Sequence, residues 1–337
     1  MKIIVDAMGG DNAPLEIVKG ALQGRARWGV DIVLTGDAAQ ILRALEECGE
    51  KTVPQGVEIA NATQTVEMCD DPATVFRHKK DTSMGVGLTM LRDGKADALV
   101  SAGSTGALLT GATLITKRVR GIRRAAMAPV IPTTTGRAVL IDCGANAECT
   151  PEYLVQFAYL GNFYAKRVLG IGTPRVGLLN IGAEDEKGNA LVKDAFPMMA
   201  EAPYHFVGSV EARDLFSDIA DVCVADGFAG NLVLKTMEGV AMFMLKTMKQ
   251  ELMADTRSKM GAALAKPALR RLKHTLDYTE VGGAPLLGVQ GAVVKAHGSS
   301  NAHAFSCAID QAIKMVNGHV VEIIEKGVAK MNSQDAQ

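Results

Sequence analysis

A turn rich in glycine and carboxylate residues follows the first predicted strand of the chain. The strand Lys2–Asp6 leads into Gly9, Gly10 and Asp11, and an apolar-periodic helix comes next. Glycines let backbone N–H groups approach a ligand, and a helix N-terminus favours an anion. Asp6 and Asp11 repel a bare phosphate, so they need a cation, a donor to orient or amides to cap. Taken alone, this turn is equally consistent with an ordinary capped strand–helix junction.

The same combination of glycine with polar side chains recurs after five more predicted strands. The segments are Ser101–Ala107, Asp142–Asn146, Asn180–Gly188, Asp226–Lys235 and Lys295–Asn301. Ligands of open α/β sheets bind beyond the carboxyl ends of the strands, so we expect these segments to meet in one cleft. A structural protein needs glycine at some turns but not this chemistry at each of them. The pattern therefore predicts an enzyme.

Three of these segments carry groups that suit an anionic substrate. Ser101–Ala107 offers hydroxyls, amides and a helix N-terminus, although Ser104 also fits an ordinary N-cap. Lys295 and His297 precede a Gly-Ser-Ser turn that opens a helix, although a lone histidine is more often structural. Lys235 lies one helical turn after Asn231 in sequence, so it either reaches back to the same loop or is solvated.

Several other kinds of site are poorly supported. The chain has no P-loop, and no GxGxxG followed by an acid about 20 residues later, so a nucleotide site is not expected. The six cysteines lack CxxC spacing and indicate free thiols in a reducing compartment. Cys143 is the cysteine best placed for nucleophilic attack, but no histidine stands near it in sequence. We therefore expect neither a metal site nor covalent catalysis.

The composition and net charge of the chain limit the classes of partner that it can bind. The formal net charge is −1 and aromatic residues make up 4% of the 337 residues, which argues against nucleic-acid binding. The chain shows neither a basic and apolar leader nor a run of 18 or more apolar residues, the length of a membrane span. The expected location is the cytoplasm, with at most peripheral membrane contact.

Alternating strand and helix patterns predict an α/β fold with a largely parallel sheet and helices on both faces. We expect a single domain over residues 1–331 and a frayed tail at 332–337. The predicted helices include Ser104–Arg118, Pro151–Leu169 and Asn301–Lys326. The predicted strands are Lys2–Asp6, Asp31–Thr35, Val57–Ala60, Ala96–Ser101, Ala128–Pro132, Arg137–Asp142, Arg175–Ile181, His205–Val207, Asp221–Ala225 and Gly291–Ala296.

The segment Met237–Asp277 differs from the rest of the chain. It is rich in methionine, and its second half carries six cations and no acid between residues 257 and 275: Arg257, Lys259, Lys266, Arg270, Arg271 and Lys273. Basic amphipathic segments bind anionic membranes or acidic proteins. The alternative is a helical excursion that packs a dimer and exposes its basic face to water.

Together these segments, with Gly282–Gly288, resemble the bacterial phosphate acyltransferase family (acyl-acyl carrier protein:phosphate acyltransferase) of phospholipid synthesis. The resemblance covers almost the whole chain, and the order and spacing of the motifs carry it. One departure is Val281, where an aromatic residue is expected.

The resemblance implies transfer of a long-chain fatty acyl group from acyl carrier protein to inorganic phosphate, giving acyl phosphate. A membrane glycerol-3-phosphate acyltransferase would consume the product. It also implies a fold similar to phosphotransacetylases and isocitrate-type dehydrogenases, a homodimer, no metal or organic cofactor, and peripheral association with the inner face of the plasma membrane.

For this reaction we assign hypothetical roles. The catalytic group has three members. Lys295 is the cation that offsets the charge of phosphate. His297 is a hydrogen-bond donor to the oxyanion or the acid that protonates the leaving sulfur, and Asn231 is a second donor to the oxyanion. The substrate-binding group is Ser104, Thr105, Gly106, Gly9, Gly10, Asn180 and Lys235. The orienting group is Asp6, Asp11, Asn146 and Asp226.

Three rival interpretations differ in what they require. A phosphotransacetylase would depend on short acyl-coenzyme A. A decarboxylating dehydrogenase would need NAD(P) and a divalent metal, and the sequence shows no clustered aspartates for one. A membrane-surface scaffold acting through Met237–Asp277 would not need the polar strand ends.

Overall fold

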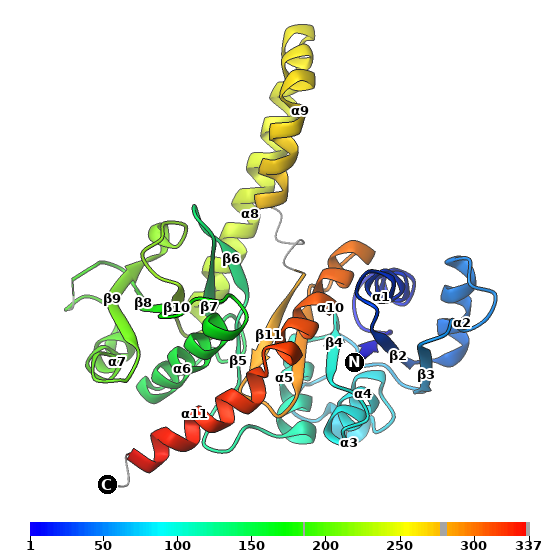
Figure 1. The fold of residues 1–337 in the computed structure, drawn as a ribbon, viewed down its shortest axis with the longest axis horizontal. Helices are drawn as coiled ribbons and strands as arrows, with labels where there is room; N and C mark the ends of the chain where they lie inside the picture. Colours follow the sequence, from blue (N-terminus) through cyan, green and yellow to red (C-terminus); the bar gives the residue numbers. More distant parts are fainter. Residues whose placement is uncertain (185, 277–281, 335–337) are drawn as a thin grey trace.

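The computed structural model describes residues 1–184, 186–276 and 282–334, and its strands form two sheets (Figure 1). The larger sheet has the spatial order β3 (Val57–Asn61), β2 (Asp31–Gly36), β1 (Lys2–Asp6), β4 (Ala98–Ser101), β12 (Ala292–Ala296), β11 (Gly283–Leu287) and β5 (Ala126–Met127). The smaller sheet has the order β6 (Val130–Pro132), β7 (Arg137–Ile141), β10 (Val222–Val224), β8 (Arg175–Asn180) and β9 (His205–Glu211).

Helices connect most of these strands, as the sequence pattern predicts. They are α1 (Leu15–Trp28), α2 (Ala38–Glu47), α3 (Val75–His78), α4 (Ser83–Arg92), α5 (Thr105–Gly111), α6 (Pro151–Arg167), α7 (Ala190–Ala200), α8 (Gly227–Leu252), α9 (Thr256–Leu276), α10 (Ala302–Asn317) and α11 (Val320–Gln334). A π turn, η1 (Ala112–Thr116), continues α5, and a 3-10 turn, η2 (Ala212–Asp214), follows β9.

Most neighbouring strands are parallel, which confirms the predicted fold class. Antiparallel pairs occur where β11 joins β12 and β5, and where β6 joins β7. The parallel register aligns three predicted site residues at one edge of the larger sheet. Asp6 at the end of β1 lies level with Ser101 of β4, and Ser101 lies level with Lys295 of β12.

A shared hydrophobic core lies under both sheets. It includes Ile3 and Val100 from the larger sheet, Ile141 and Val224 from the smaller one, and Phe305 of α10, each fully buried. Burial of such side chains contributes about 1.5–3 kcal/mol apiece relative to exposure. Two further clusters pack against the larger and the smaller sheet separately.

Some element boundaries differ from the prediction. The short strands β5 and β11 are missed, because β11 contains glycine and proline, which are usual turn signals. The predicted helix Asn301–Lys326 is divided between α10 and α11, and His319 at the break has a φ of 49°. Residues 332–334 of the predicted tail continue α11, while 335–337 and Val281 lie outside the described residues.

Helices α8 and α9 form a hairpin that projects away from both sheets (Figure 1). This confirms the predicted helical excursion, although helix α8 itself begins at Gly227, ten residues before the predicted start at Met237. Much of its apolar surface is exposed, including Phe243 (68%) and Leu264 (87%). Within the described residues, α8 is also the one helix long and apolar enough to cross a membrane by length and composition, and only 6% of its apolar window is buried.

Candidate active site between the two sheets

A cavity of about 1540 Å³ lies where the carboxyl ends of the strands meet. The strand-end segments contribute its polar lining, as predicted, apart from the segment after β8. The polar and glycine residues that line it include Gly10, Asp11, Ser104, Thr105, Gly144, Asn231, Lys235, Lys295, His297 and Ser299. Residues distant in sequence therefore share one site.

The loop between β4 and α5 forms one wall of this cavity. The Ser101 hydroxyl donates to Asp6 Oδ2 at 2.7 Å and accepts from the Gly103 amide at 3.1 Å. Ser104 caps α5, since its Oγ accepts from the Ala107 amide at 3.5 Å, and it also lines the cavity beside Thr105. The cap and the proposed ligand contact are thus compatible at one residue.

Asp6 lies beneath this loop and is completely buried. Burial raises the pKa of its carboxyl, while hydrogen bonds from Ser101 and Ser83 and the charge of Lys295 oppose the rise. Gly9 must be glycine here, because a Cβ would lie 2.7 Å from both Asp6 Oδ2 and the Gly103 nitrogen. Gly9 therefore serves the packing around Asp6 and is not among the residues that line the cavity.

Lys295 brings a buried ammonium group to the cavity. Its Nζ donates to the Ala102 carbonyl at 3.3 Å and to the Ala296 carbonyl. Burial, and after it the charge of Lys235, lower the pKa of Lys295 to about 8 against the opposing charges of Asp6 and Asp11. Lys295 is therefore mostly cationic at neutral pH and loses its charge in mildly alkaline solution.

His297 lies beside Lys235 in the cavity lining. Its Nδ1 accepts from the Ser299 backbone N–H at 3.2 Å and lies 2.8 Å from the Ser299 hydroxyl, which places the ring proton on Nε2. Burial lowers the pKa of His297, and the charge of Lys235 adds to this shift, so the ring is neutral at neutral pH. Nε2 lies 3.5 Å from Lys235 Nζ, so two donors approach one point that suits an anionic oxygen.

Glu238 is a site residue that the sequence analysis missed. Its carboxylate pairs with Lys235 Nζ at 2.7 Å, and the residue lines the same cavity. The only signal in the sequence was the spacing of three residues between Lys235 and Glu238 on one helix, which is common on solvated surfaces. The pair holds Lys235 on the side of α8 that faces His297.

A second polar layer behind the cavity joins the two sheets. Asp142 Oδ1 accepts from the Met127 amide of β5 at 2.8 Å, and its Oδ2 accepts from Asn146 Nδ2 at 2.9 Å. Asn146 Nδ2 also donates to the Ala125 carbonyl at 2.8 Å. Burial raises the pKa of Asp142, with these donors opposing the rise. Asn146 itself does not line the cavity, a position that suits the orienting role assigned to it.

Asp226 acts on the site through helix α8. Its Oδ1 accepts from the amides of Phe228 at 3.0 Å and Ala229 at 2.8 Å, so it caps the helix that carries Asn231 and Lys235. A cap of this kind stabilises a helix by about 1 kcal/mol. It also fixes the direction in which the first turns of α8 enter the cavity.

Other predicted residues lie outside the cavity lining. Asn180 donates to the Lys187 carbonyl at 3.1 Å and to Ser209 Oγ at 3.0 Å, so its amide organises its own loop. A Cβ on Gly106 would lie 2.8 Å from Pro72, which indicates close packing. Cys143 does line the cavity, but burial raises the pKa of its thiol well above the ordinary value, which disfavours the nucleophilic thiolate.

Metal-ligating side chains are not gathered at this site. Across residues 1–184, 186–276 and 282–334, no group of three or more His, Cys, Asp or Glu residues is arranged to hold an ion.

Comparison with known proteins identifies the family. Residues 1–323 match the family model described as fatty acid synthesis protein. A relative named phosphate acyltransferase in Alkaliphilus oremlandii is 45% identical over 335 residues, covering 99% of each chain. Proteins of the same name in Clostridioides difficile and Geobacillus thermodenitrificans are 44% and 46% identical, covering 99% and 96% of this chain and 98% of each relative.

Solved structures show the same fold at low sequence identity. A phosphotransacetylase from Streptococcus pyogenes has a TM-score of 0.65 and 15% identity, covering 96% of this chain and 94% of its own. A branched-chain phosphotransacylase from Enterococcus faecalis has a TM-score of 0.58 and 16% identity, covering 94% and 99%. By its match over nearly the whole length, the chain belongs to the fatty acid synthesis protein family, in which its close relatives carry the name phosphate acyltransferase.

Proposed function

We propose that this enzyme transfers a long-chain fatty acyl group from the thioester of acyl carrier protein to inorganic phosphate, giving acyl phosphate for phospholipid synthesis. The observation that carries the proposal is the group of Lys295, Lys235 and His297 at one end of a large, mostly apolar cavity. The name phosphate acyltransferase, carried by relatives over 40% identical, supports it.

Phosphate is the proposed nucleophile and needs capture more than activation. The hydroxyls of Ser104 and Thr105 donate to it, and the Lys295 ammonium offsets its charge. Correct alignment of two reactants can supply several kcal/mol of the barrier reduction. A phosphate oxygen then attacks the thioester carbonyl carbon, and a C–O bond forms as the carbonyl oxygen takes up the electron pair.

The resulting oxyanion is stabilised by donors fixed in advance. His297 Nε2–H and Lys235 Nζ approach the same point, and Asn231 on α8 adds an amide donor from the same wall. Collapse of the intermediate breaks the C–S bond, and the thiolate leaves with the electron pair and takes up a proton. No oxidation state changes in these steps, so the reaction itself calls for no redox cofactor.

The proposed partners follow from the substrate and the hairpin. Acyl carrier protein brings the thioester, and a membrane glycerol-3-phosphate acyltransferase consumes the product. The exposed apolar face of the α8–α9 hairpin supports a homodimer contact, and its exposed cations, such as Arg270 and Arg271, support attraction to an anionic bilayer. The six cysteines form no disulfide, which agrees with a cytoplasmic enzyme at the inner face of the plasma membrane.

The direct test uses purified protein and palmitoyl-acyl carrier protein, with and without inorganic phosphate, and traps acyl phosphate with hydroxylamine. The expected result is hydroxamate that depends on phosphate and forms without nucleotide or added metal. Product from acyl-coenzyme A with inert acyl carrier protein would instead identify a phosphotransacetylase. No product from either thioester would overturn the proposal.

A further inference from the structure

The cavity continues from the polar groups into an apolar arm. Its polar end holds Lys295 and His297, and the arm runs between β6 and the inner face of α8. The apolar residues that line the arm are Val130, Ile131, Pro132, Phe216, Met237, Val240, Ala241, Met244 and Leu272, and Thr133, Thr134, Arg213 and Thr275 line the same cavity beside them. The arm is therefore open to the reacting groups at one end and lined mostly by apolar side chains beyond them.

One face of α8 forms the length of this arm. Met237, Val240, Ala241 and Met244 recur at intervals of three and four residues, so they lie on one side of the helix. At 1.5 Å per residue, the path from Asn231 to Met244 is about 20 Å long. Met242 lies on the same helix but does not line the cavity. The apolar lining thus extends along α8, away from the proposed oxyanion site.

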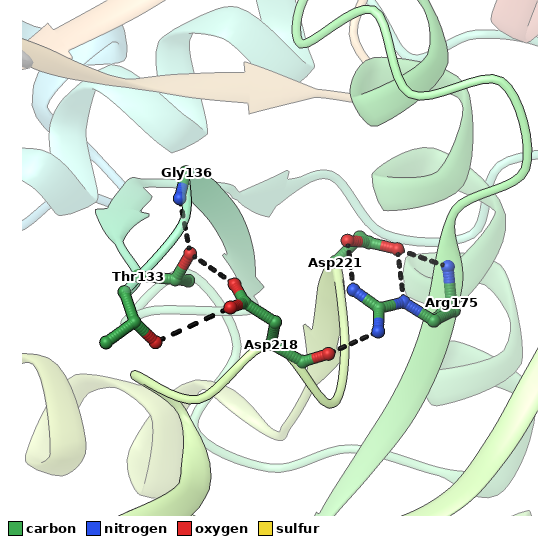
Figure 2. Close-up of polar contacts among 6 residues, drawn as sticks. Thr133, Gly136, Arg175, Asp218 and Asp221 are labelled. Atoms are coloured by element: carbon green, nitrogen blue, oxygen red, sulfur yellow. Dashed lines mark hydrogen bonds and ion pairs between the residues drawn. The ribbon is translucent and has the colours of Figure 1, made fainter.

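The opposite wall is held in place by a polar network (Figure 2). Thr133 and Thr134 in the β6–β7 turn donate to the Asp218 carboxylate, and Thr134 also donates to the Phe216 carbonyl, its amide at 2.9 Å and its hydroxyl at 2.8 Å. Arg175 donates to the Asp218 carbonyl and binds both oxygens of Asp221, at 3.0 and 2.9 Å. The loop that carries Phe216 is therefore tied to β6 and β8.

From this geometry we propose that the arm between β6 and α8 binds the substrate's acyl chain and sets the chain length that the enzyme prefers. The inference rests on the proposed acyl transfer to phosphate. Carbon atoms near the carbonyl pass Met237, and the methyl end of a long chain reaches Met244. The chain covers side chains that are otherwise about half exposed, such as Val240 at 51% and Met244 at 57%.

Apolar contact makes this arm selective for longer chains. Each buried methylene contributes about 0.8 kcal/mol, which is about a factor of four in kcat/KM while the arm has room for it. Because the lining is mostly apolar, the affinity that it adds grows with the length of the chain. Preference for long chains then falls when the distal end of the arm is filled.

The test compares Met244→Trp with the matched control Met242→Trp. Both residues are methionines on α8 with nearly equal exposure, 57% and 56%, but only Met244 lines the cavity. The probes are octanoyl-, dodecanoyl- and hexadecanoyl-acyl carrier protein at saturating phosphate, without vesicles. For Met244→Trp we expect the ratio of kcat/KM for hexadecanoyl to octanoyl to fall at least about tenfold, because two or more methylenes lose their site.

The other variants test which part of the arm holds which end of the acyl chain. Val240→Trp lies closer to the reacting groups and should also reduce the dodecanoyl rate, while Met242→Trp should keep the wild-type ratios. Equal chain-length profiles in Met244→Trp and Met242→Trp would overturn the acyl arm. So would a change in oligomeric state in both variants with unchanged ratios, which would assign this helix to a second copy of the chain. Activity with octanoyl substrate separates these results from failure of the proposed reaction, which would abolish product in the wild-type enzyme.

Discussion

The buried polar residues that form the floor of the cavity contrast with the exposed apolar residues of the α8–α9 hairpin. At the floor, Asp6, Asp142 and Lys295 are buried polar groups that hydrogen-bond to residues of other strands and loops, although Asp6 Oδ1 is without a partner among the described residues. Along the hairpin, apolar side chains such as Phe243 and Leu264 remain exposed. Buried polar groups without partners cost about 1–3 kcal/mol, whereas exposed apolar groups mark surfaces that other molecules cover.

The two regions also differ in what brings their residues together. The cavity floor depends on tertiary structure, since its groups come from β1, β4, β7 and β12. The hairpin is made of two helices that are adjacent in sequence, and much of its apolar surface is exposed. Changes at the floor should therefore alter chemistry, and changes along the hairpin should alter partners and chain length.

The largest expected effect is on turnover. Removing the imidazole in His297→Ala takes away a preorganised donor and should lower kcat about 10²- to 10³-fold while the fold is retained. Steady-state rates and circular dichroism measure the two quantities. His303→Ala is the control, because His303 is exposed on α10 and does not line the cavity. A loss below about threefold at His297 would contradict its catalytic role.

Charge reversal on the hairpin should separate binding from chemistry. Replacing Lys266, Arg270 and Arg271 with Glu should weaken partitioning onto anionic vesicles about 100-fold or more, because each cation near the surface contributes about 1 kcal/mol. Vesicle sedimentation measures the effect, and turnover without vesicles should be unchanged. Reversal of three exposed cations on the body provides the control: Arg43, Lys51 and Lys95. Similar losses in both triple variants would reject a specific membrane face.

The pH dependence of phosphate use should report Lys295. Because its pKa is lowered to about 8, the cation is present below that pH and is lost above it. We expect kcat/KM for phosphate to fall about tenfold between pH 7 and pH 9. In Lys295→Arg the charge persists through this range, so the alkaline decline should disappear even where the rate is lower overall. An unchanged decline would show that another group causes it.

The smallest expected effect on turnover comes from the network behind Phe216. Arg175→Ala removes a two-point ion pair with Asp221 and should lower the unfolding free energy by about 1–3 kcal/mol, with octanoyl transfer nearly unchanged. Urea denaturation measures the loss. The exposed pair of Arg213 with Glu211 is the comparison, and Arg213→Ala should cost less than about 1 kcal/mol. Equal losses would mean that the Arg175 network has no special structural role.

Sequence patterns were enough to predict the fold class and the convergence of most polar strand ends on one cavity. Alternation of strand and helix patterns predicted the α/β fold, and glycine with polar residues after successive strands predicted the cleft. This worked because parallel strands place their carboxyl ends at one edge, so residues such as Asp6, Ser101 and Lys295 meet whatever their separation in sequence. The methionine-rich, basic composition likewise predicted the excursion that became the hairpin.

Which polar strand ends reach the cavity, and how their charges interact, depended on the packing of the two sheets and could not be predicted from the sequence. Asn180 has the same local pattern as Asn231, but its strand lies away from the cavity and its amide serves its own loop. Glu238 and the lowered pKa values of Lys295 and His297 depend on burial and on neighbours from other elements. The division into two sheets could not be predicted from the sequence either. Hydrophobic alternation indicates that a strand is buried, but it does not specify which strand lies beside it.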